Sequence, residues 1–502
     1  MHIPLQIVRD GPETLQNQIF GQTRDFVLSG RLKPGTAMPG SRVLAEELGV
    51  SRNTVLLAYE RLITEGYLQT LPATGTFVSN DLPDASIVYN PRSELRHPPH
   101  ESTSHRRPVI FEGRAQRRVS QNRDTVSIDF WGSRPNPSCF PLNAWRRSLL
   151  RKLTHAGTSL TEYGDPAGMY ELRRAIADFV GPARGFRLEP EQIVIVHGIQ
   201  EALNIIARLF IEQGTLAATE NPCSQGAAYT FESYGAELIP VPVDDDGIDV
   251  ALLPDQPISL LYLTPSHQFP TGRTLSLERR FRVLEWAWRV GAYIIEDDYD
   301  SDFRYDGPPL SALAGLDRHD SVIYLGTFSK SIGPGLRIGY MVLPPDLVEP
   351  AVTIKALLDS GHSWLDQAVL AEFIASGDYI RHLRRIRLVY KSRRDRLLEV
   401  LRREFGDVTV SGRRGGMHIM WRLPDDFPTA AKLETMARES GVGIYSLGSG
   451  GVHDYDCSPY SERSILLGYS SVPEDRIDEG IRRIAERLAR SGRAARTSRA
   501  TS

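Results

Sequence analysis

The pattern of apolar and polar positions divides the chain into three stretches. Over residues 1–80, apolar positions recur at helical spacing in three short segments, and two short runs of strand type follow. Residues 81–125 carry little periodic apolar content. From about residue 126, short apolar runs alternate with helical patterns such as that of residues 277–290. This alternation predicts an α/β body in which helices cover both faces of a mostly parallel sheet.

Two serines of the first stretch are placed to begin helices. Ser41 can cap a short helix over residues 42–48, and Ser51 can cap a longer helix that reaches about residue 64. On the longer helix, four side chains at i, i+3, i+4 and i+7 are expected to face inward: Val55, Ala58, Tyr59 and Leu62. Polar side chains gather at its start: Ser51, Arg52, Asn53 and Thr54. Helix, turn, helix and hairpin is the order of a winged helix-turn-helix, whose second motif helix enters the major groove.

Four segments of this stretch resemble the GntR family of bacterial regulators. They are Leu-Lys-Pro-Gly from residue 32, Ser-Arg-x-Leu-Ala-x-x-Leu-Gly-Val-Ser-Arg-x-Thr-Val-x-x-Ala-Tyr-x-x-Leu from residue 41, Glu-Gly-Tyr-Leu from residue 65 and Gly-Thr-Phe-Val from residue 75. The resemblance implies a DNA-binding domain over residues 1–80 that contacts operator DNA through Arg42, Arg52, Asn53 and Thr54, with Ser51 beside them. The simpler interpretation is an ordinary capped surface helix. Charge does not decide between them, because residues 1–80 hold seven basic and seven acidic side chains.

Composition limits what the other stretches can be. Residues 81–125 contain five prolines and eight arginines and are predicted to form a flexible linker; residues 491–502 are predicted to form a disordered basic tail. The chain of 502 residues has a formal net charge of −3, so no global field draws it onto nucleic acid. Its three cysteines lie far apart and favour neither disulfides nor zinc, which indicates a reducing cytoplasm. No apolar run approaches the ~20 residues of a membrane helix.

Polar groups follow three of the predicted strands of the body. After residues 193–196 comes His-Gly-Ile-Gln, where a glycine between strand and helix leaves backbone N–H groups that can hold a phosphate. After residues 292–295 comes Glu-Asp-Asp-Tyr-Asp-Ser-Asp. Here Asp297 can hold a protonated ring nitrogen and Tyr299 can donate to a phenolate oxygen. The alternative is a solvated acidic loop that binds a metal or nothing. Ligands of parallel sheets bind at this edge, where the strands end.

The third strand, residues 322–325, leads into a loop with a distinctive lysine. Lys330 is flanked by serines in a Gly- and Pro-containing segment, and Arg337 follows seven residues later. A lysine amine whose pKa is lowered by neighbouring charge can form a Schiff base with an aldehyde. The fork of Arg337 and the hydroxyls of Thr327 and Ser329 suit a phosphate. A solitary lysine is usually a surface residue, but this one converges with the other two strand ends.

Together these segments resemble the fold-type I aminotransferases over residues 126–490. The resemblance implies pyridoxal 5′-phosphate (PLP) as the cofactor, bound to Lys330 as an aldimine. Asp297 would pair with the pyridine nitrogen and Tyr299 would reach the ring oxygen. The phosphate would be held by Ile199, Gln200, Thr327, Ser329 and Arg337. Tyr163, in Glu-Tyr-Gly-Asp-Pro-x-Gly, matches the tyrosine that reaches the neighbouring subunit's phosphate, which implies a homodimer with shared sites.

A GntR-type module fused to an aminotransferase-like body is the plan of the MocR/GabR regulators. The resemblance implies a transcriptional regulator that senses PLP, or a small amine, amino acid or sulfonate that reacts with PLP. Three positions depart from the enzymes: Phe269 replaces an asparagine, Ser224 a stacking aromatic and Leu466 the arginine that holds the substrate carboxylate. Such a contact contributes roughly 1.5–3 kcal/mol, so ordinary α-amino-acid transamination is disfavoured. Arg463 and Arg134 are candidate replacements.

Two other functions remain open from the sequence alone. One is an active aminotransferase that carries an accessory DNA-binding domain, for which steady turnover would be the sign. The other is a regulator that binds no PLP and keeps the body as a relic, for which a colourless protein would be the sign.

Overall fold

The computed structural model describes residues 3–9, 11–82, 125–307, 310–455, 458 and 460–500, with backbone alone for 491–500. The chain divides into two compact units, residues 1–108 and 109–502. Most of the predicted linker, residues 83–124, lies outside the described residues.

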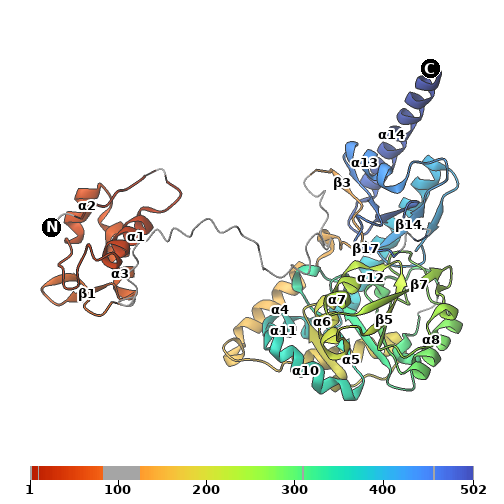
Figure 1. The fold of residues 1–502 in the computed structure, drawn as a ribbon, viewed down its shortest axis with the longest axis horizontal. Helices are drawn as coiled ribbons and strands as arrows, with labels where there is room; N and C mark the ends of the chain where they lie inside the picture. The colour runs from red at the N-terminus through yellow and green to blue at the C-terminus, as the bar shows by residue number, and fades with distance from the viewer. Residues whose placement is uncertain are drawn as a thin grey trace, which may run out of the picture. The chain divides into compact units, whose positions relative to one another are not determined.

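The described residues of the N-terminal unit form three helices and a hairpin (Figure 1). They are α1 (Leu15–Leu28), α2 (Ser41–Leu48), α3 (Arg52–Thr64), β1 (Leu68–Leu71) and β2 (Gly75–Val78), and the two strands pair antiparallel. The four side chains predicted to face inward from α3 are all buried, as predicted. They pack in one small core with Ile19, Phe20 and Leu44 from the first two helices. Gly49 turns the chain between α2 and α3 with a φ of 64°.

The serine at the start of α2 does not act as its cap. The helix begins at Ser41 itself, and the capping position is Gly40, which has no side chain to accept an N–H. At the start of α3 the prediction is confirmed, because the Ser51 hydroxyl accepts a hydrogen bond of 3.1 Å from the Thr54 backbone.

The large unit is built on an eight-stranded sheet in the order β4-β12-β11-β10-β9-β5-β7-β8. The strands are β4 (Ile193–Val196), β5 (Leu216–Asn221), β7 (Glu237–Asp244), β8 (Gly247–Ile248), β9 (Leu260–Leu263), β10 (Tyr293–Asp297), β11 (Val322–Thr327) and β12 (Gly339–Val342). Strand β12 is antiparallel to both of its neighbours, so β4 runs in the same direction as β11. Strands β5, β7, β9, β10 and β11 pair parallel in turn. Strands β4, β10 and β11 therefore end at one edge.

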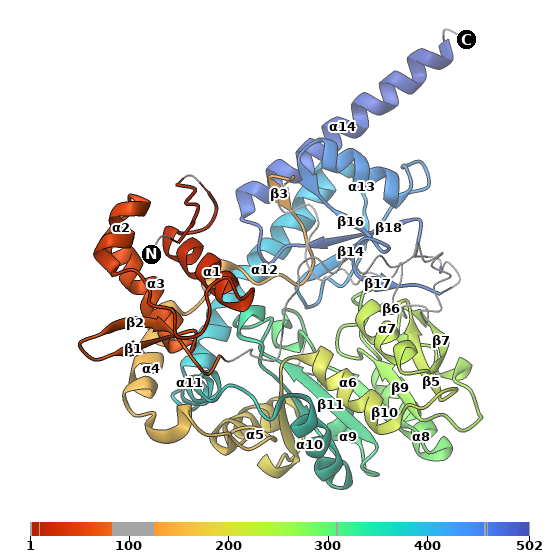
Figure 2. The same ribbon diagram turned by 60° about the vertical axis from the view of Figure 1, so that its left-hand side comes forward.

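Helices cover both faces of this sheet, as predicted (Figures 1 and 2). They are α4 (Leu142–Thr154), α5 (Tyr170–Arg184), α6 (Ile199–Phe210), α7 (Gln225–Ser233), α8 (Leu277–Val290), α9 (Leu313–Leu316), α10 (Pro345–Asp359), α11 (Trp364–Ala375) and α12 (Asp378–Phe405). Neighbouring residues of one strand enter different cores: Ile295 packs with α6 and α7, whereas Ile294 packs with α8. This alternation is what a strand buried on both faces requires.

A smaller layer follows α12. Its antiparallel sheet contains β13 (Thr409–Ser411), β14 (His418–Arg422), β18 (Ser464–Gly468) and β16 (Tyr445–Ser446). Short pairs join β3 (Ile128–Asp129) to β15 (Val442–Gly443) and β6 (Cys223–Ser224) to β17 (Val452–His453). Helices α13 (Ala430–Glu439) and α14 (Glu474–Ala500) complete the layer (Figure 2).

The last helix runs past the predicted domain boundary at residue 490. Helix α14 continues to Ala500 through a segment rich in Ala and Arg, which are strong helix formers. Among the described helices, none combines the length and apolar character needed to cross a membrane.

Candidate functional site

Eight predicted site residues line one cavity of about 430 Å³ at the edge where β4, β10 and β11 end. They are Ile199, Gln200, Asp297, Tyr299, Thr327, Ser329, Lys330 and Arg337. The ninth, Tyr163, lies elsewhere, with its side chain 90% exposed. Residues that are separated by up to 138 positions in sequence thus meet because the strands that carry them share a direction.

Asp297 is a buried carboxyl at the last position of β10. Its Oδ2 accepts a hydrogen bond of 2.7 Å from the Tyr262 hydroxyl, while its Oδ1 is buried without a hydrogen-bond partner. Burial raises the pKa of Asp297 to about 7, and the positive charge of Lys330 opposes that rise. A buried acceptor without a donor, in the wall of a cavity, suits a ligand that carries an N–H group.

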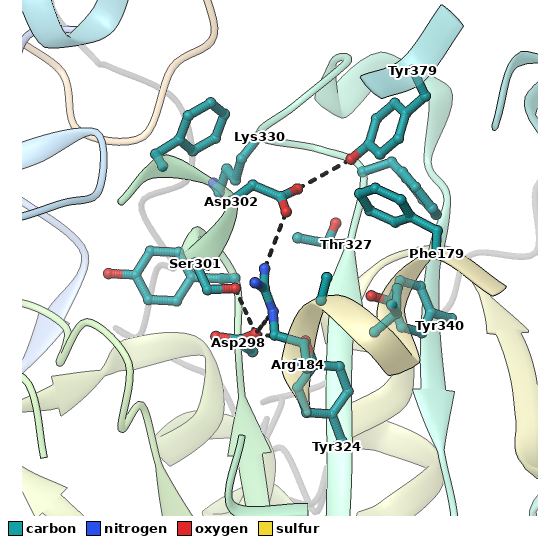
Figure 3. Close-up of a pocket in the computed structure, with 15 residues that line it drawn as sticks. Phe179, Arg184, Asp298, Ser301, Asp302, Tyr324, Thr327, Lys330, Tyr340 and Tyr379 are labelled. Carbon is teal, nitrogen blue, oxygen red and sulfur yellow. Dashed lines mark hydrogen bonds and ion pairs between the residues drawn. The ribbon is translucent and has the colours of Figure 1, made fainter. Parts of the chain in front are cut away.

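Lys330 lies in the loop after β11, and its Nζ donates to the Ser133 carbonyl at 3.4 Å. A buried ionic network lies beside this loop (Figure 3). Arg184 extends from α5 between two carboxylates, at 2.9 Å from Asp298 and 3.0 Å from Asp302. The Tyr379 hydroxyl lies 3.1 Å from Asp302. Both carboxylates are paired with the Arg184 guanidinium and with hydroxyl donors. These contacts hold the segment beside the lysine loop in place.

Helix α12 also holds the lysine loop in place. The Tyr379 hydroxyl lies 2.8 Å from the Ser331 hydroxyl, and the ring of His382 hydrogen-bonds the Ser331 carbonyl at 2.7 Å. Both residues belong to α12, so this helix positions the residue next to Lys330. A side chain held in this way keeps its amine directed at one place in the cavity.

The turn from β4 into α6 forms a cradle for an anion. Gly198 precedes the helix with a φ of 92° and offers no side-chain cap, so the first turn of α6 presents its backbone N–H groups. A Cβ at Gly198 would crowd the Arg337 guanidinium at 3.0 Å, and the positive φ also favours glycine at this position. Arg337 donates to the His197 carbonyl. The Thr327 hydroxyl, at 2.9 Å from that of Ser329, completes the predicted set.

The residues predicted to contact DNA lie at the start of α3 and on α2. Arg42, Ser51, Arg52 and Asn53 are exposed, whereas Thr54 is half-buried and its hydroxyl lies 2.8 Å from that of Ser51. The Arg52 Nε lies 3.4 Å from the Ser41 hydroxyl. Arg52 therefore extends from the helix terminus that carries a positive partial charge, where contacts to phosphates and bases are made.

Two family models match the chain over separate ranges. Residues 15–78 match the gntR family of bacterial regulatory proteins, and residues 134–484 match aminotransferase class I and II. The chain is 36% identical to the HTH-type regulator YdeL of Bacillus subtilis, over 94% of this chain and 96% of that protein. It is 35% identical to the probable rhizopine catabolism regulatory protein MocR of Rhizobium meliloti, over 95% and 94%. The chain belongs to the MocR-type transcriptional regulators of the GntR family.

Solved structures support the same assignment for the body of this MocR-type regulator. A kynurenine aminotransferase of Pyrococcus horikoshii, solved with PMP, superposes with a TM-score of 0.67 at 30% identity over 74% of this chain and 92% of that one. Both predicted resemblances and the predicted fold are thereby confirmed. Membership of the aminotransferase class also indicates PLP as the cofactor, as predicted.

The three positions predicted to depart from the enzymes lie together in the structure of this MocR-type regulator. Phe269, Ser224 and Leu466 all line the cavity. Neither predicted replacement for the missing arginine does so. Arg463 donates to the carbonyls of Phe427 and Pro424, and Arg134 pairs with Asp129 at 3.0 Å. Both guanidinium groups are thus hydrogen-bonded or paired to oxygen atoms outside the cavity lining.

Sequence reasoning missed several residues of the site. Trp131, His418 and Tyr445 line the cavity from segments outside the main sheet. The His418 Nε2 lies 3.1 Å from the Pro270 carbonyl, and burial lowers the pKa of His418 to about 4. Near it, His267 lies 3.1 Å from the Tyr299 hydroxyl and 3.0 Å from Asp300. Two of these residues lie in segments with a sequence signal: His267 in His-Gln-Phe-Pro, which the resemblance places where the enzymes have a ring-contacting motif, and Trp131 in Phe-Trp-Gly-Ser-Arg-Pro.

Proposed function

We propose that this regulator uses Lys330 to hold PLP and to exchange it with a small amine effector, and that this exchange changes operator binding. The observation that carries the proposal is the convergence of Lys330, the unpartnered Oδ1 of Asp297 and the Gly198–Arg337 cradle on one cavity. These three groups match the aldehyde, the ring nitrogen and the phosphate of PLP. Their chain carries a DNA-reading helix as well.

Each residue has a distinct task in this proposal. When bound, PLP supplies an aldehyde that condenses reversibly with primary amines. Asp297 would keep its Oδ2 on the Tyr262 hydroxyl, and its Oδ1 would accept a hydrogen bond from the protonated ring nitrogen. Ionisation of Asp297 at neutral pH is favoured by that cation, which offsets the effect of burial. Arg337, Thr327, Ser329 and the first turn of α6 would bind the phosphate. The Tyr299 hydroxyl, which donates to the His267 carbonyl at 3.1 Å in this structure, would donate to the ring oxygen.

The cavity wall favours an effector other than a common α-amino acid. Leu466 is buried on β18 and lines the cavity beside Tyr445 and Trp131. A carboxylate placed there would meet apolar and aromatic surface instead of an arginine fork, at a cost of one to two decades in affinity. The proposed ligands are therefore an amine without an α-carboxylate, a sulfonate, or PLP itself. Relatives are named for rhizopine catabolism and for pyridoxine biosynthesis, so the regulated process differs between them.

We further propose that the working unit is a homodimer. Tyr163 would reach the cofactor phosphate of the partner subunit, which accounts for an aromatic side chain that is 90% exposed in a single chain. If the two subunits share their PLP sites, effector binding at a site would change how the dimer holds its two DNA-binding modules. A useful switch of this kind needs a coupling free energy of about 1–3 kcal/mol. Arg42, Arg52 and Asn53 would make the operator contacts.

Steady transamination is the second candidate function, because the body matches aminotransferases at 30% identity. Phe269 and Leu466 argue against it, since both replace polar groups that enzymes use on the ring and the substrate. Measured turnover well below the usual ~10 per second with common amino acids is expected. Amine exchange or a single half-reaction is compatible with the regulator.

The test compares Lys330→Ala with Lys432→Ala, which removes an exposed lysine of α13. Visible absorbance of the purified protein reports PLP, and gel shift on operator DNA selected by the wild-type protein reports binding. We expect Lys330→Ala to lose both the lysine-bound absorbance and every change of operator affinity caused by amines. Lys432→Ala is expected to retain both.

The outcomes separate the candidate functions. A response to amines that persists in Lys330→Ala would overturn the proposal. A colourless wild-type protein that takes up no added PLP would support the relic body instead. Sustained product formation from common amino acids would favour the enzyme.

A further inference from the structure

A second cavity, of about 280 Å³, has His267 and Asp300 among its lining residues. Lys330, Asp297 and Arg337 do not line it. Four arginines line it. Arg184 is paired with Asp298 and Asp302. The other three come from different segments: Arg304 from the loop after β10, Arg387 from α12 and Arg414 from the turn before β14. None of them has a role in binding PLP.

The backbone brings these arginines together at residues 302–306. Arg304 forms an isolated antiparallel bridge with Gly415, and the Tyr305 N–H donates to the Arg414 carbonyl at 3.0 Å. Arg387 donates its Nε to the Asp302 carbonyl. Main-chain contacts thus hold Arg304 and Arg414 together, the Arg387 side chain is bound to the backbone of the same short segment, and all three side chains line a common space.

Most acidic side chains of this region are paired with other groups, and Asp298 and Asp302 pair with Arg184. Among the described lining residues, Asp300 is the one carboxylate; it lies 3.0 Å from the His267 ring, and its Oδ2 has no hydrogen-bond partner. Asp306 pairs with Arg394 at 2.6 Å. In the described part of the chain, no carboxylate lies within 4.0 Å of the guanidinium groups of Arg304, Arg387 and Arg414. The cavity thus holds an excess of positive charge.

Arg304 shows the consequence most clearly. Its Nε is buried and has no hydrogen-bond acceptor. Burial, followed by the charges of Arg414 and Arg280, lowers the pKa of Arg304. A buried donor without an acceptor is costly, and like charges that face one cavity repel each other. A bound anion would remove both costs.

We propose that this cavity is a second ligand site, which binds a small anion through phosphate or carboxylate oxygens. Guanidinium forks match these planar or tetrahedral groups and bind them with two hydrogen bonds. The volume restricts the ligand to a small molecule. The site does not depend on the proposed role of Lys330.

The test uses the full-length protein loaded with PLP, so that the phosphate cradle at Gly198 is filled. Inorganic phosphate and malonate are titrated separately by calorimetry, which distinguishes a phosphate from a carboxylate ligand. The variants are Arg304→Gln and Arg414→Gln, and the matched control is Arg187→Gln, whose side chain is 92% exposed beside Glu189. Saturable binding of at least one anion is expected, with affinity reduced at least tenfold in both cavity variants and unchanged in the control.

A further variant, Arg337→Gln, separates this site from the cofactor cradle. Anion binding that is retained in Arg337→Gln and lost in Arg304→Gln supports the proposal, whether or not PLP acts as a sensor. No saturable binding of either anion, or binding that only Arg337→Gln removes, would overturn it. Circular dichroism spectra matching the wild type show that the glutamine variants are folded.

Discussion

In the N-terminal unit, four of the five residues predicted to contact DNA are consecutive in sequence, whereas the cofactor cavity of the body is lined by residues from Trp131 to Leu466. Most of the residues predicted to contact DNA lie at the exposed start of α3. The cavity residues lie on strand ends, loops and a second sheet, and several are buried. The first set requires one capped helix, and the second requires the whole fold of the body.

This difference changes how each function bears on stability. An exposed arginine remains solvated, so it can be placed on a small module at little cost. The body instead buries carboxyl groups: burial raises the pKa of Glu220, Glu296 and Asp297 to about 7. Each of them favours its neutral form in the absence of a cation. The cofactor-free body is therefore expected to lose stability because of its site, while the N-terminal unit is not.

The largest expected effect tests whether the two units are energetically separate. Leu62 is fully buried in the small core of the N-terminal unit. Leu62→Ala is expected to destabilise this unit by about 3 kcal/mol, because it removes buried methyl groups and leaves a cavity. Hydrogen exchange of residues 15–78 should rise and operator binding should fall, while the PLP absorbance of the body stays unchanged.

Leu57 supplies the matched control on the same helix, since its side chain is 41% exposed. Leu57→Ala is expected to change the unfolding free energy of this unit, as measured by hydrogen exchange, by less than about 0.5 kcal/mol. A loss of PLP absorbance in Leu62→Ala would show that the units fold together and would remove the basis of the comparison.

Local patterns predicted the parts of the structure that depend on nearby residues. The four inward-facing positions of α3 and the full span of α8 follow from helical periodicity, which nearby residues determine. The direction of the strands and the polar residues after them were enough to bring eight site residues to one cavity. The role of Ser41 was misjudged, because the helix begins at Ser41 itself, one residue earlier than predicted, and Gly40 is therefore the residue before it.

Long-range pairing set the limit of the sequence analysis. His418 reaches the cavity because β14 pairs with β18 in the smaller sheet, a register that no local pattern specifies. The arginines of the second cavity meet through an isolated bridge between Arg304 and Gly415. Neither the segment around Arg304 nor the segment around Gly415 has a distinctive apolar pattern. Residues that are brought together by loop-to-loop contacts therefore require coordinates to be found.

The second effect concerns the stability cost of the cofactor site. In the folded, cofactor-free protein the pKa of Asp297 is raised to about 7 from an ordinary value of 3.8. The unfolded chain releases this proton at lower pH than the folded one, so stability falls as pH rises from about 4 to 7. Asp297→Asn removes this loss. As the pH rises from 5 to 7, the unfolding free energy of Asp297→Asn is expected to increase relative to that of the wild type by about 2 kcal/mol.

Urea unfolding of both cofactor-free proteins at several pH values measures this difference. At pH 7, saturation with PLP should make the wild type more stable than Asp297→Asn, because the wild-type carboxylate would bind the protonated ring nitrogen and the amide would not. A pH-independent difference between the two proteins would mean that Asp297 is ionised throughout, and the predicted cost of the site would be wrong.

The smallest effect examines the exposed side of the comparison. Arg52→Ala removes an exposed guanidinium at the start of α3 and is expected to weaken operator binding about tenfold, or ~1.4 kcal/mol. Arg24→Ala, on α1, is the control and should change affinity by less than twofold. Thermal unfolding and PLP absorbance should be the same in all three proteins, since Arg52 contributes no buried surface to either unit. If Arg52 contacts a phosphate, weakening will be uniform across DNA sequences and the salt dependence will fall by about one ion. If it contacts a base edge, the loss will be confined to the cognate operator. Equal operator affinity in Arg52→Ala and wild type would instead show that α3 is a capped surface helix without a reading function.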